Sequence, residues 1–317
     1  MRRVAILVVI AGSVAALLTG CASDDGTDST VQIVATTTIL GDIARNVAGD
    51  NADVEVLMPV GVNPHDFQPS SQQVAAIQRA DLVVANGLGL EAGLHDVLEA
   101  VESDGVLVWE VAADLDPLLF ATADNDEEDG HEDEDGHEHG SLDPHFWLDP
   151  LRVAAAAGLM SEHLSEVAPD VDWSAAADEY AAELEALHSQ SVEQLAVVSV
   201  TDRRLVTNHL SLGYFSDLYG FEMIGTVIPG GASLANPSSA ELASLVDIIE
   251  REQVPAIFTE TIEPDALAQA VAAEVGYDVA VVELYTGSLG ESGTDGDTLI
   301  GMLTTNVSRI AEALGTP

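Results

Sequence analysis

The chain of 317 residues contains a single cysteine, Cys21, and its nine basic residues are all arginines, because lysine is absent. One cysteine excludes an internal disulfide. Against the nine basic residues stand 55 acidic ones, which gives a formal net charge of -46. A surface of that sign repels phosphate backbones and anionic lipids, so nucleic acid is excluded as a partner and cations are the natural ligands. Adaptation to salt, or general solubility, explains the acidity equally well, so the charge alone does not establish a metal site.

An apolar run long enough to cross a membrane is also missing from the N-terminus. Two arginines precede the apolar residues 4–18, and Leu-Thr-Gly-Cys follows, ending at Cys21. This order is typical of a secretory signal peptide, and the run is shorter than a membrane span. A lone cysteine directly after Leu-Thr-Gly resembles the lipobox of bacterial lipoproteins, in which the thiol receives a diacylglycerol. We therefore expect a lipoprotein signal peptide at residues 1–20, a lipid anchor on Cys21 and a tether at 21–30. That anchor would hold the protein at the outer face of the cytoplasmic membrane; the alternative is an ordinary signal peptide with an unrelated cysteine.

Residues 124–140 read DNDEEDGHEDEDGHEHG and contain ten carboxylates and three histidines. A run of like charges interleaved with glycine and histidine has too little apolar surface to fold by itself, so a mobile, solvated loop is expected. Its composition favours divalent metal ions. We expect His131, His137 and His139 to hold metal only as an auxiliary, weaker group.

Downstream of the tether, short β-branched runs alternate with helical patterns. Strands are predicted at residues 31–36, 54–60, 81–85, 106–111, 205–207, 221–228, 256–259 and 279–284. Helices are predicted at residues 39–47, 71–79 and 239–252, the last with capping-box spacing between Ser238 and Glu241. Such alternation is typical of βαβ units with mainly parallel sheets. The predicted fold class is α/β, with two similar lobes at residues 31–170 and 201–317.

Residues 172–198, between the two lobes, contain neither glycine nor proline and are rich in alanine, glutamate and leucine. One long, rigid helix is therefore expected within the linker 171–200, on the order of 40 Å long. A rigid helix of this kind restrains the movement of the lobes. We therefore expect the lobes to close only slightly when a ligand binds between them.

Three of the nine histidines share a context that the others lack. His65 follows Asn-Pro beyond a predicted strand, His145 follows Asp-Pro, and His209 follows Thr-Asn at a predicted strand end. Ligands of open α/β sheets gather at the carboxyl ends of strands. Three imidazoles there can fill three positions of a tetrahedral zinc site at about 2.0 to 2.1 Å, although each alone is more typical of a hydrogen-bonded loop histidine. Three further histidines lie in helix-like, polar surroundings and are not expected to bind metal: His95, His163 and His188.

Four segments together resemble the signature segments of the metal-binding lipoproteins that serve zinc and manganese ABC importers. They are NPHDFQPS (63–70), DPHFWLDP (143–150), TNHLSLGYFSDLYG (207–220) and VVELYTGSLGESGTDGDTLIGML (281–303). The similarity covers nearly all of the mature chain in the same order, with the acidic run where zinc members carry theirs. The resemblance implies two α/β lobes bridged by a long helix, with the metal between them and with His65, His145 and His209 as its ligands. A histidine at the third position, where manganese members tend to have glutamate, favours Zn²⁺ over Mn²⁺.

One position departs from that family. Its members usually have an acidic fourth ligand where this chain has Gly287. Either water completes the coordination sphere, or Glu260 or Glu283 reaches in, or the acidic loop donates a carboxylate. Asp149 and Glu260 are also candidates for accepting a hydrogen bond from a ligand histidine, which would fix its tautomer.

The expected function is that of an extracytoplasmic binding protein, not an enzyme. It would capture a divalent metal and deliver it, as a monomer, to the membrane permease of an ABC importer. A separate ATPase subunit would supply the energy, because the chain has no Walker A loop. The alternatives are a manganese-binding member of the family, a surface metal buffer or adhesin, and a zinc hydrolase with Glu260 or Asp149 as base. Against the hydrolase, the sequence has neither an HExxH helix nor a G-x-S-x-G elbow.

The ligand set also predicts a dependence on pH. Imidazole binds metal only when it is neutral, with a reference pKa of about 6.5. Three histidines therefore predict a zinc affinity that falls between about pH 7 and pH 5 by more than one proton per pH unit.

Overall fold

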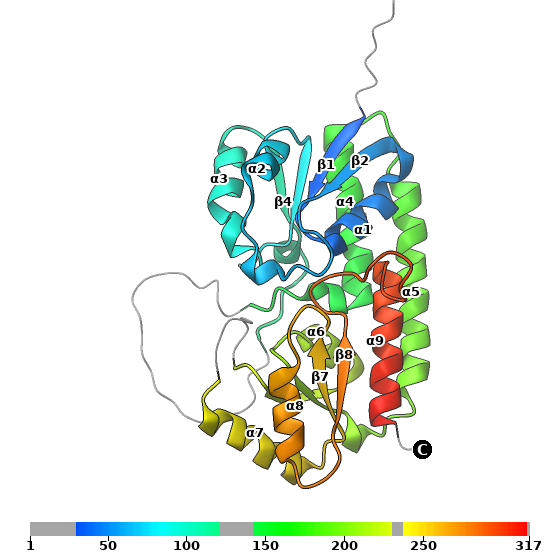
Figure 1. Cartoon of the computed structure of the whole chain (residues 1–317). Coiled ribbons are helices and arrows are strands. Elements are labelled where there is room, and N and C mark those ends of the chain that lie inside the picture. Colours follow the sequence, from blue (N-terminus) through cyan, green and yellow to red (C-terminus); the bar gives the residue numbers. More distant parts are fainter. Residues whose placement is uncertain (1–29, 121–141, 230–236, 316–317) are drawn as a thin grey trace, which may run out of the picture.

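The structure, a computed structural model, describes residues 30–120, 142–229 and 237–315. The expected signal peptide, Cys21 and most of the tether lie outside these ranges, as does the acidic run with His131, His137 and His139. Two α/β lobes follow one another along the long axis of the molecule, and long helices run beside them (Figure 1). Among the described residues, no helix combines the length and the apolar character that a membrane span requires.

The first lobe is built on a parallel four-stranded sheet with the strand order β2-β1-β3-β4. Its strands are β1 Val31–Ala35, β2 Ala52–Val56, β3 Leu82–Ala85 and β4 Leu107–Glu110. Three of them match the predicted ranges to within about a residue at each end, whereas β2 begins earlier and ends well before the predicted residue 60. The reason lies in the chain after β2. Leu57 and Met58 still donate backbone hydrogen bonds to the first strand and its extension, but the next residue is a proline and has no N–H to continue the ladder.

Helices cover both faces of this sheet (Figure 1). The first three are α1 Thr38–Ala48, α2 Ser71–Ile77 and α3 His95–Ser103. The helix α1 begins after Thr37, whose hydroxyl accepts a hydrogen bond from the N–H of Leu40, and α2 begins with a capping box between Ser70 and Gln73. The apolar side chains of α2 and α3 pack on one face, while α1 packs on the other.

The second lobe repeats this topology. Its parallel sheet has the order β6-β5-β7-β8, which is the order of the first sheet with each strand number raised by four. The strands are β5 Arg204–Thr207, β6 Glu222–Thr226, β7 Ala256–Glu260 and β8 Ala280–Leu284, and the helices are α6 Gly213–Tyr219, α7 Ser239–Glu252 and α8 Ala266–Glu274. The capping box predicted for α7 is confirmed, because the Ser238 and Glu241 side chains each accept a hydrogen bond from the other's backbone N–H. The prediction of two similar α/β lobes is therefore confirmed.

Three long helices join the lobes. The expected connecting helix is α5 (Ser174–Leu195), which is shorter than the linker 171–200 and about 33 Å long. The helix α4 (Pro150–Val167) packs along α5 beside the first lobe, and α9 (Leu299–Leu314) packs along it beside the second (Figure 1). Asp42 of α1 ties these elements together, because its Oδ2 accepts hydrogen bonds from the N–H of Leu299 at 3.2 Å and from the Tyr180 hydroxyl at 3.3 Å.

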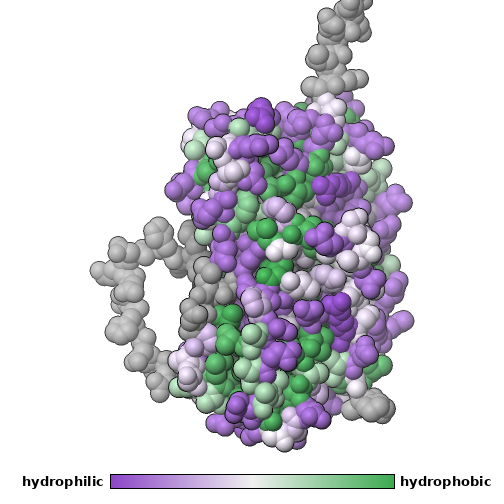
Figure 2. Space-filling view, in the orientation of Figure 1, coloured by the Kyte–Doolittle hydropathy of each residue, from purple (hydrophilic) through white to green (hydrophobic). Residues whose placement is uncertain are grey.

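A single apolar core extends through both lobes along these helices. It includes Ile33 of β1 and Leu184 of α5, and it continues into Phe258 of β7 and Ile310 of α9. Smaller cores fill the space under α2 and α3 and under α7 and α8. On the face seen in Figure 2, hydrophilic residues cover much of the surface, in keeping with the acidic composition. The shared core implies that the lobes are held together by packing and not only by a chain connection.

Replacing Leu184 with alanine tests this shared core. Leu184 is 0% exposed at the centre of α5, so the variant leaves a cavity in the shared core and should lower the free energy of unfolding by about 2–5 kcal/mol. Val192 on the same helix is 49% exposed, and Val192→Ala should change that free energy by less than about 0.5 kcal/mol. Urea unfolding of the two variants measures the difference, and equal effects would contradict a core shared through α5.

Candidate metal centre

Two of the three singled-out histidines are presented by the same local turn. The side-chain oxygen of Asn63 accepts a hydrogen bond from the backbone N–H of His65 at 3.0 Å, and Asp143 Oδ1 accepts one from the N–H of His145 at 2.9 Å. Asn and Asp side chains form such turns with the residue two positions later, and the proline between them fixes φ. His209 arrives differently, two residues beyond the end of β5.

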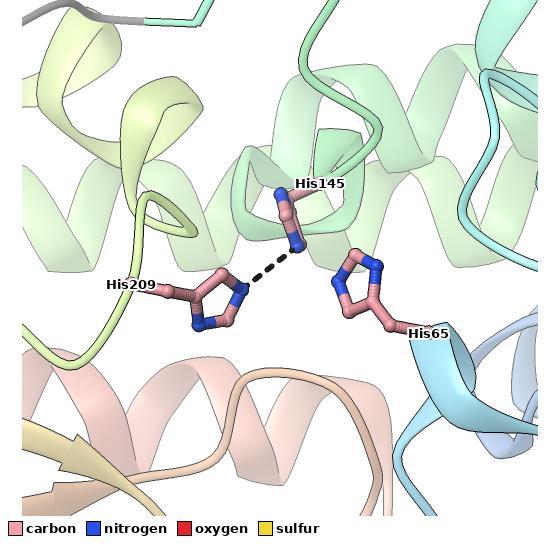
Figure 3. Close-up of side chains that lie close together, drawn as sticks. All are labelled: His65, His145 and His209. Carbon is pink, nitrogen blue, oxygen red and sulfur yellow. Dashed lines mark hydrogen bonds between the residues drawn. The ribbon is translucent and has the colours of Figure 1, made fainter. Parts of the chain in front are cut away.

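The three histidines come from three separate parts of the fold and point toward one another (Figure 3). His65 lies in the short 3-10 turn Pro64–Asp66 of the first lobe, and His209 follows β5, an inner strand of the second sheet. His145 immediately precedes the turn Phe146–Leu148, which leads into α4 between the lobes. The prediction that the histidines lie at the carboxyl ends of strands therefore holds for His209, which follows β5. His145 lies instead in the segment between the lobes.

The spacing of the three rings fits a single small ion. Nε2 of His145 lies 3.4 Å from Nε2 of His209, and the ring centroids are 5.3–5.6 Å apart. One ligand atom of each histidine lies within 4.8 Å of the others. Two nitrogens bound tetrahedrally to zinc at about 2.05 Å are about 3.3 Å apart, so the observed nitrogen separation is close to that of a zinc site.

His145 is oriented by a buried carboxylate. Its Nδ1 lies 2.7 Å from Oδ1 of Asp143, and both side chains are almost fully buried. A proton on Nδ1 donated to this carboxylate leaves Nε2, which faces the other two histidines, with a free lone pair.

His209 has a second buried carboxylate behind it. Its Nδ1 is in contact with Oε1 of Glu260, and the other oxygen of Glu260 accepts a hydrogen bond from the Thr286 hydroxyl at 2.6 Å. Burial alone lowers the pKa of His209, but the neighbouring Glu260 carboxylate outweighs it and raises this pKa above its ordinary value. Burial likewise raises the pKa of Glu260, yet the His209 charge and these hydrogen bonds lower it overall. Without metal, the pair therefore favours a proton on His209.

His65 is held neutral instead. Burial, reinforced by the two neighbouring histidines, lowers the pKa of His65 to about 3. Its Nε2 is buried and has no hydrogen-bond partner in the part of the chain that the structure describes. A buried, neutral nitrogen without a partner beside two other imidazoles fits a metal ligand, because an ion would supply the missing interaction.

The acidic residues considered for this site lie in different places. Glu260 has both oxygens engaged as described, so it stands behind His209. Asp149 accepts hydrogen bonds from the first N–H groups of α4 and pairs with Arg152 at 3.4 Å, so its carboxylate serves the helix start. Glu283 is exposed on β8. Gly287 does not have the positive φ that would restrict it to glycine, and a Cβ there would lie 2.6 Å from Cδ1 of Ile262 and 3.3 Å from Cδ of Pro64, next to His65.

The three other histidines that the structure describes lie away from this centre. His163 packs against Trp109 and His188 stacks on Tyr219, with ring centroids 4.7 and 5.6 Å apart, so their surroundings are more aromatic than the sequence suggests. His95 is exposed on α3 beside Asp96 and Glu99. All three are expected to be structural or solvated, as the sequence indicates.

Residues that support the histidines were partly missed by sequence reasoning. Asp143 and Asn63 carry a signal that was available, because the pattern Asx-Pro-His occurs twice. Thr286 carries no local signal, since its contact with Glu260 forms only when β7 and β8 bring together residues 26 positions apart in the chain.

The chain is similar to known proteins over most of its length. The profile of the ZnuA family, described as zinc-uptake complex component A, periplasmic, matches residues 33–313. The manganese-binding lipoprotein MntA of Halalkalibacterium halodurans is 30% identical over 307 residues, 95% of each chain. The zinc-binding lipoprotein AdcA of Streptococcus pneumoniae is 28% identical over 316 residues, which are 98% of this chain and 61% of AdcA.

Solved structures share the fold. The periplasmic zinc binding protein TroA from Treponema pallidum matches with a TM-score of 0.78 and 26% identity, over 90% of this chain and 100% of TroA. A crystal structure of ZnuA matches with a TM-score of 0.75 and 26% identity, over 90% and 99% of the two chains. The profile match over most of the chain, together with the repeated sheet topology, shows that this protein belongs to the ZnuA family of zinc-uptake complex components.

Proposed function

We propose that this protein captures a divalent metal ion, Zn²⁺ in preference to Mn²⁺, and delivers it to an ABC importer. The observation that carries the proposal is the convergence of His65, His145 and His209, with nitrogen atoms spaced for a single ion. The ion is the cargo and undergoes no reaction. The family membership and the lipoproteins MntA and AdcA among the relatives support the transport role.

The donor set supports zinc. All three converging groups are imidazole nitrogens, which suit Zn²⁺, whereas Mn²⁺ prefers carboxylate, carbonyl and water oxygens. Glu260, the nearest acidic candidate, has both oxygens engaged by His209 and Thr286. The relatives do not decide the metal, since MntA is named for manganese and AdcA for zinc.

The same contacts argue against a hydrolase. A water activated on zinc needs a free general base within hydrogen-bond reach. Of the two proposed bases, Glu260 holds His209, and Asp149 caps α4 and pairs with Arg152. A passive buffer that relied on the acidic run alone would not need three converging histidines, two of which are buried with a carboxylate behind the ring.

The setting of the proposed function is the outer face of the cytoplasmic membrane. Cys21 carries the lipid anchor, and the acidic surface raises the local concentration of cations near the protein. Zinc binds weakly and transiently to His131, His137 and His139, and then passes to the tight site formed by His65, His145 and His209. The monomer docks on a permease, and this docking releases the ion. A separate ATPase subunit supplies the energy for transport.

Single alanine replacements of the three histidines test the assignment. His65→Ala, His145→Ala and His209→Ala should each weaken zinc binding by more than about 100-fold, beyond the loss typical of changes in the groups around a ligand. A variant with His131, His137 and His139 all changed to alanine should keep one tight zinc and lose only weaker equivalents. Competition titration with a chromophoric chelator measures both, and exposed His95→Ala is the control. A tight site that survives the first three changes and is lost in the loop variant would overturn the assignment.

Replacing Gly287 with aspartate tests whether the site has a free coordination position. The new carboxylate would lie beside Pro64 and His65 and should tighten zinc binding by at least about tenfold, or about 1.4 kcal/mol. The end of the Ile262 side chain must move to make room, so urea unfolding is measured alongside affinity. Gly287→Asn has the same size without the charge and is the matched control. If both variants fold and bind zinc equally, no open position lies within reach of residue 287.

The protonation of His209 governs the expected response to acid. Zinc must displace the proton that Glu260 stabilises there, so affinity should fall as pH drops below the raised pKa of His209. His65, with its pKa near 3, contributes no proton between pH 8 and pH 5, so the slope should be shallower than three ordinary histidines would give. In Glu260→Gln the charge is lost, the pKa of His209 falls, and the loss of affinity should begin at lower pH. Zinc titrations from pH 8 to pH 5 compare the two proteins, and superimposable profiles would refute the coupling.

A further inference from the structure

The helix α6 of the second lobe lies directly against the residue that orients His145. Asp143 is 0% exposed, and only its Oδ1 is engaged by His145. Its Oδ2 is buried, has no hydrogen-bond partner among the described residues, and lies over Gly213, the first residue of α6. A Cβ at position 213 would overlap Oδ2, and the atoms it would meet in the described ranges all belong to the Asp143 carboxyl group. The missing side chain of Gly213 is therefore what allows the carboxylate to sit where it meets the His145 ring.

The next residue of α6 fixes the backbone of the same segment. Tyr214 is 1% exposed, and its hydroxyl donates a hydrogen bond to the carbonyl oxygen of Asp143 at 2.8 Å. The hydroxyl also accepts one from the N–H of Leu118 at 3.2 Å, and Asp143 donates its own N–H to the carbonyl of Leu118 at 2.7 Å. One phenol thus joins the two chain segments that meet beside His145.

Arg152 makes a cation–π contact with the Tyr214 ring. Its guanidinium carbon lies 4.9 Å from the ring centroid, and its Nη1 donates hydrogen bonds to the carbonyls of Leu115 and Asp116. The ring, the guanidinium group and the segment before Leu118 therefore form one packed unit. Movement of Tyr214 away from this unit would cost several contacts together.

We propose that Gly213 and Tyr214 are positioning residues for His145, acting through Asp143, so that α6 of the second lobe helps to set the orientation of this ligand. This inference rests on the proposed binding of metal by His145. The first lobe holds the same segment by a different bond, since the Asn86 amide donates to the carbonyl of Pro144 at 3.0 Å. Segment 143–145 therefore accepts hydrogen bonds from both lobes, and its position depends on the relative placement of the two lobes.

Gly213→Ala is the first test. Alanine is the better helix former, so the variant should not weaken α6 itself, and any loss must come from the displaced Asp143 carboxylate. Zinc affinity should fall about 10- to 100-fold, the range for losing a carboxylate behind a ligand histidine. The absorption spectrum of the Co²⁺-loaded protein should change as the geometry is distorted. Gly158→Ala in α4 is the matched control, because a Cβ there would meet no described residue within 4 Å.

A double-mutant cycle separates positioning from general damage. In Asp143→Ala the carboxylate that a Cβ at position 213 would strike is absent, so adding Gly213→Ala should cause no further loss of zinc affinity. Additive losses in the double variant would overturn the proposal. Tyr214→Phe is an independent test, because it keeps the buried ring and removes only the hydroxyl that bonds to Asp143 and Leu118. This variant should also weaken zinc binding and alter the Co²⁺ spectrum.

His145→Ala is measured in the same titrations so that the two proposals can fail separately. If His145→Ala retains wild-type zinc affinity, the metal assignment fails and the positioning role fails with it. If His145→Ala loses zinc while folded Gly213→Ala and Tyr214→Phe keep wild-type affinity and spectrum, only the role of α6 is refuted.

Discussion

The core shared by the two lobes is the constraint on which the rest of the structure depends. His65 belongs to the first lobe and His209 to the second, so their rings stay 5.6 Å apart only if the lobes keep one arrangement. Packing of α5 against α4 and α9 supplies that arrangement through buried apolar contacts. Metal sites tolerate errors of about 0.2 Å in ligand distance, far less than a loosely tethered pair of lobes would hold. A rigid connection is thus a condition for the proposed site and not merely a feature of the fold.

Around that frame, the histidines are prepared in different ways. His65 is kept neutral by burial, while His209 is kept basic by Glu260. His145 receives its orientation from Asp143 within its own turn. A protein with a formal charge of -46 has many carboxylates, yet the two behind the rings are distinguished by burial and by their specific contacts. The general acidity attracts cations from a distance, whereas these two carboxylates act at the ring nitrogens.

Much of this could be predicted from the sequence because its signals are local. Alternating β-branched and helical runs indicated both sheets, the Ser238 and Glu241 spacing indicated the start of α7, and the glycine-free stretch indicated α5. The convergence of the three histidines was expected from their motifs. Two differences from the prediction had local signals: Pro59 ends the β2 ladder early, and the pair Asp149-Pro150 is typical of a helix start, so Asp149 caps α4. What could not be predicted depends on long-range contacts. The contact of α6 with Asp143 joins residues 70 positions apart and leaves no pattern in either segment except a glycine.

The bonds that cross between the lobes indicate how a captured ion would be released. Asn63, whose side chain holds the turn of His65, donates its amide to Glu263 of the second lobe at 2.5 Å. The Ser288 hydroxyl accepts a hydrogen bond from the N–H of Gly61 at 3.0 Å in the loop that leads to that turn. Separating the lobes by about 1 Å would stretch these bonds and move His65 from His209 by several times the tolerance of a zinc site. A permease that draws the lobes apart would therefore weaken metal binding through the same contacts that assemble the site, with no chemical step on the ion.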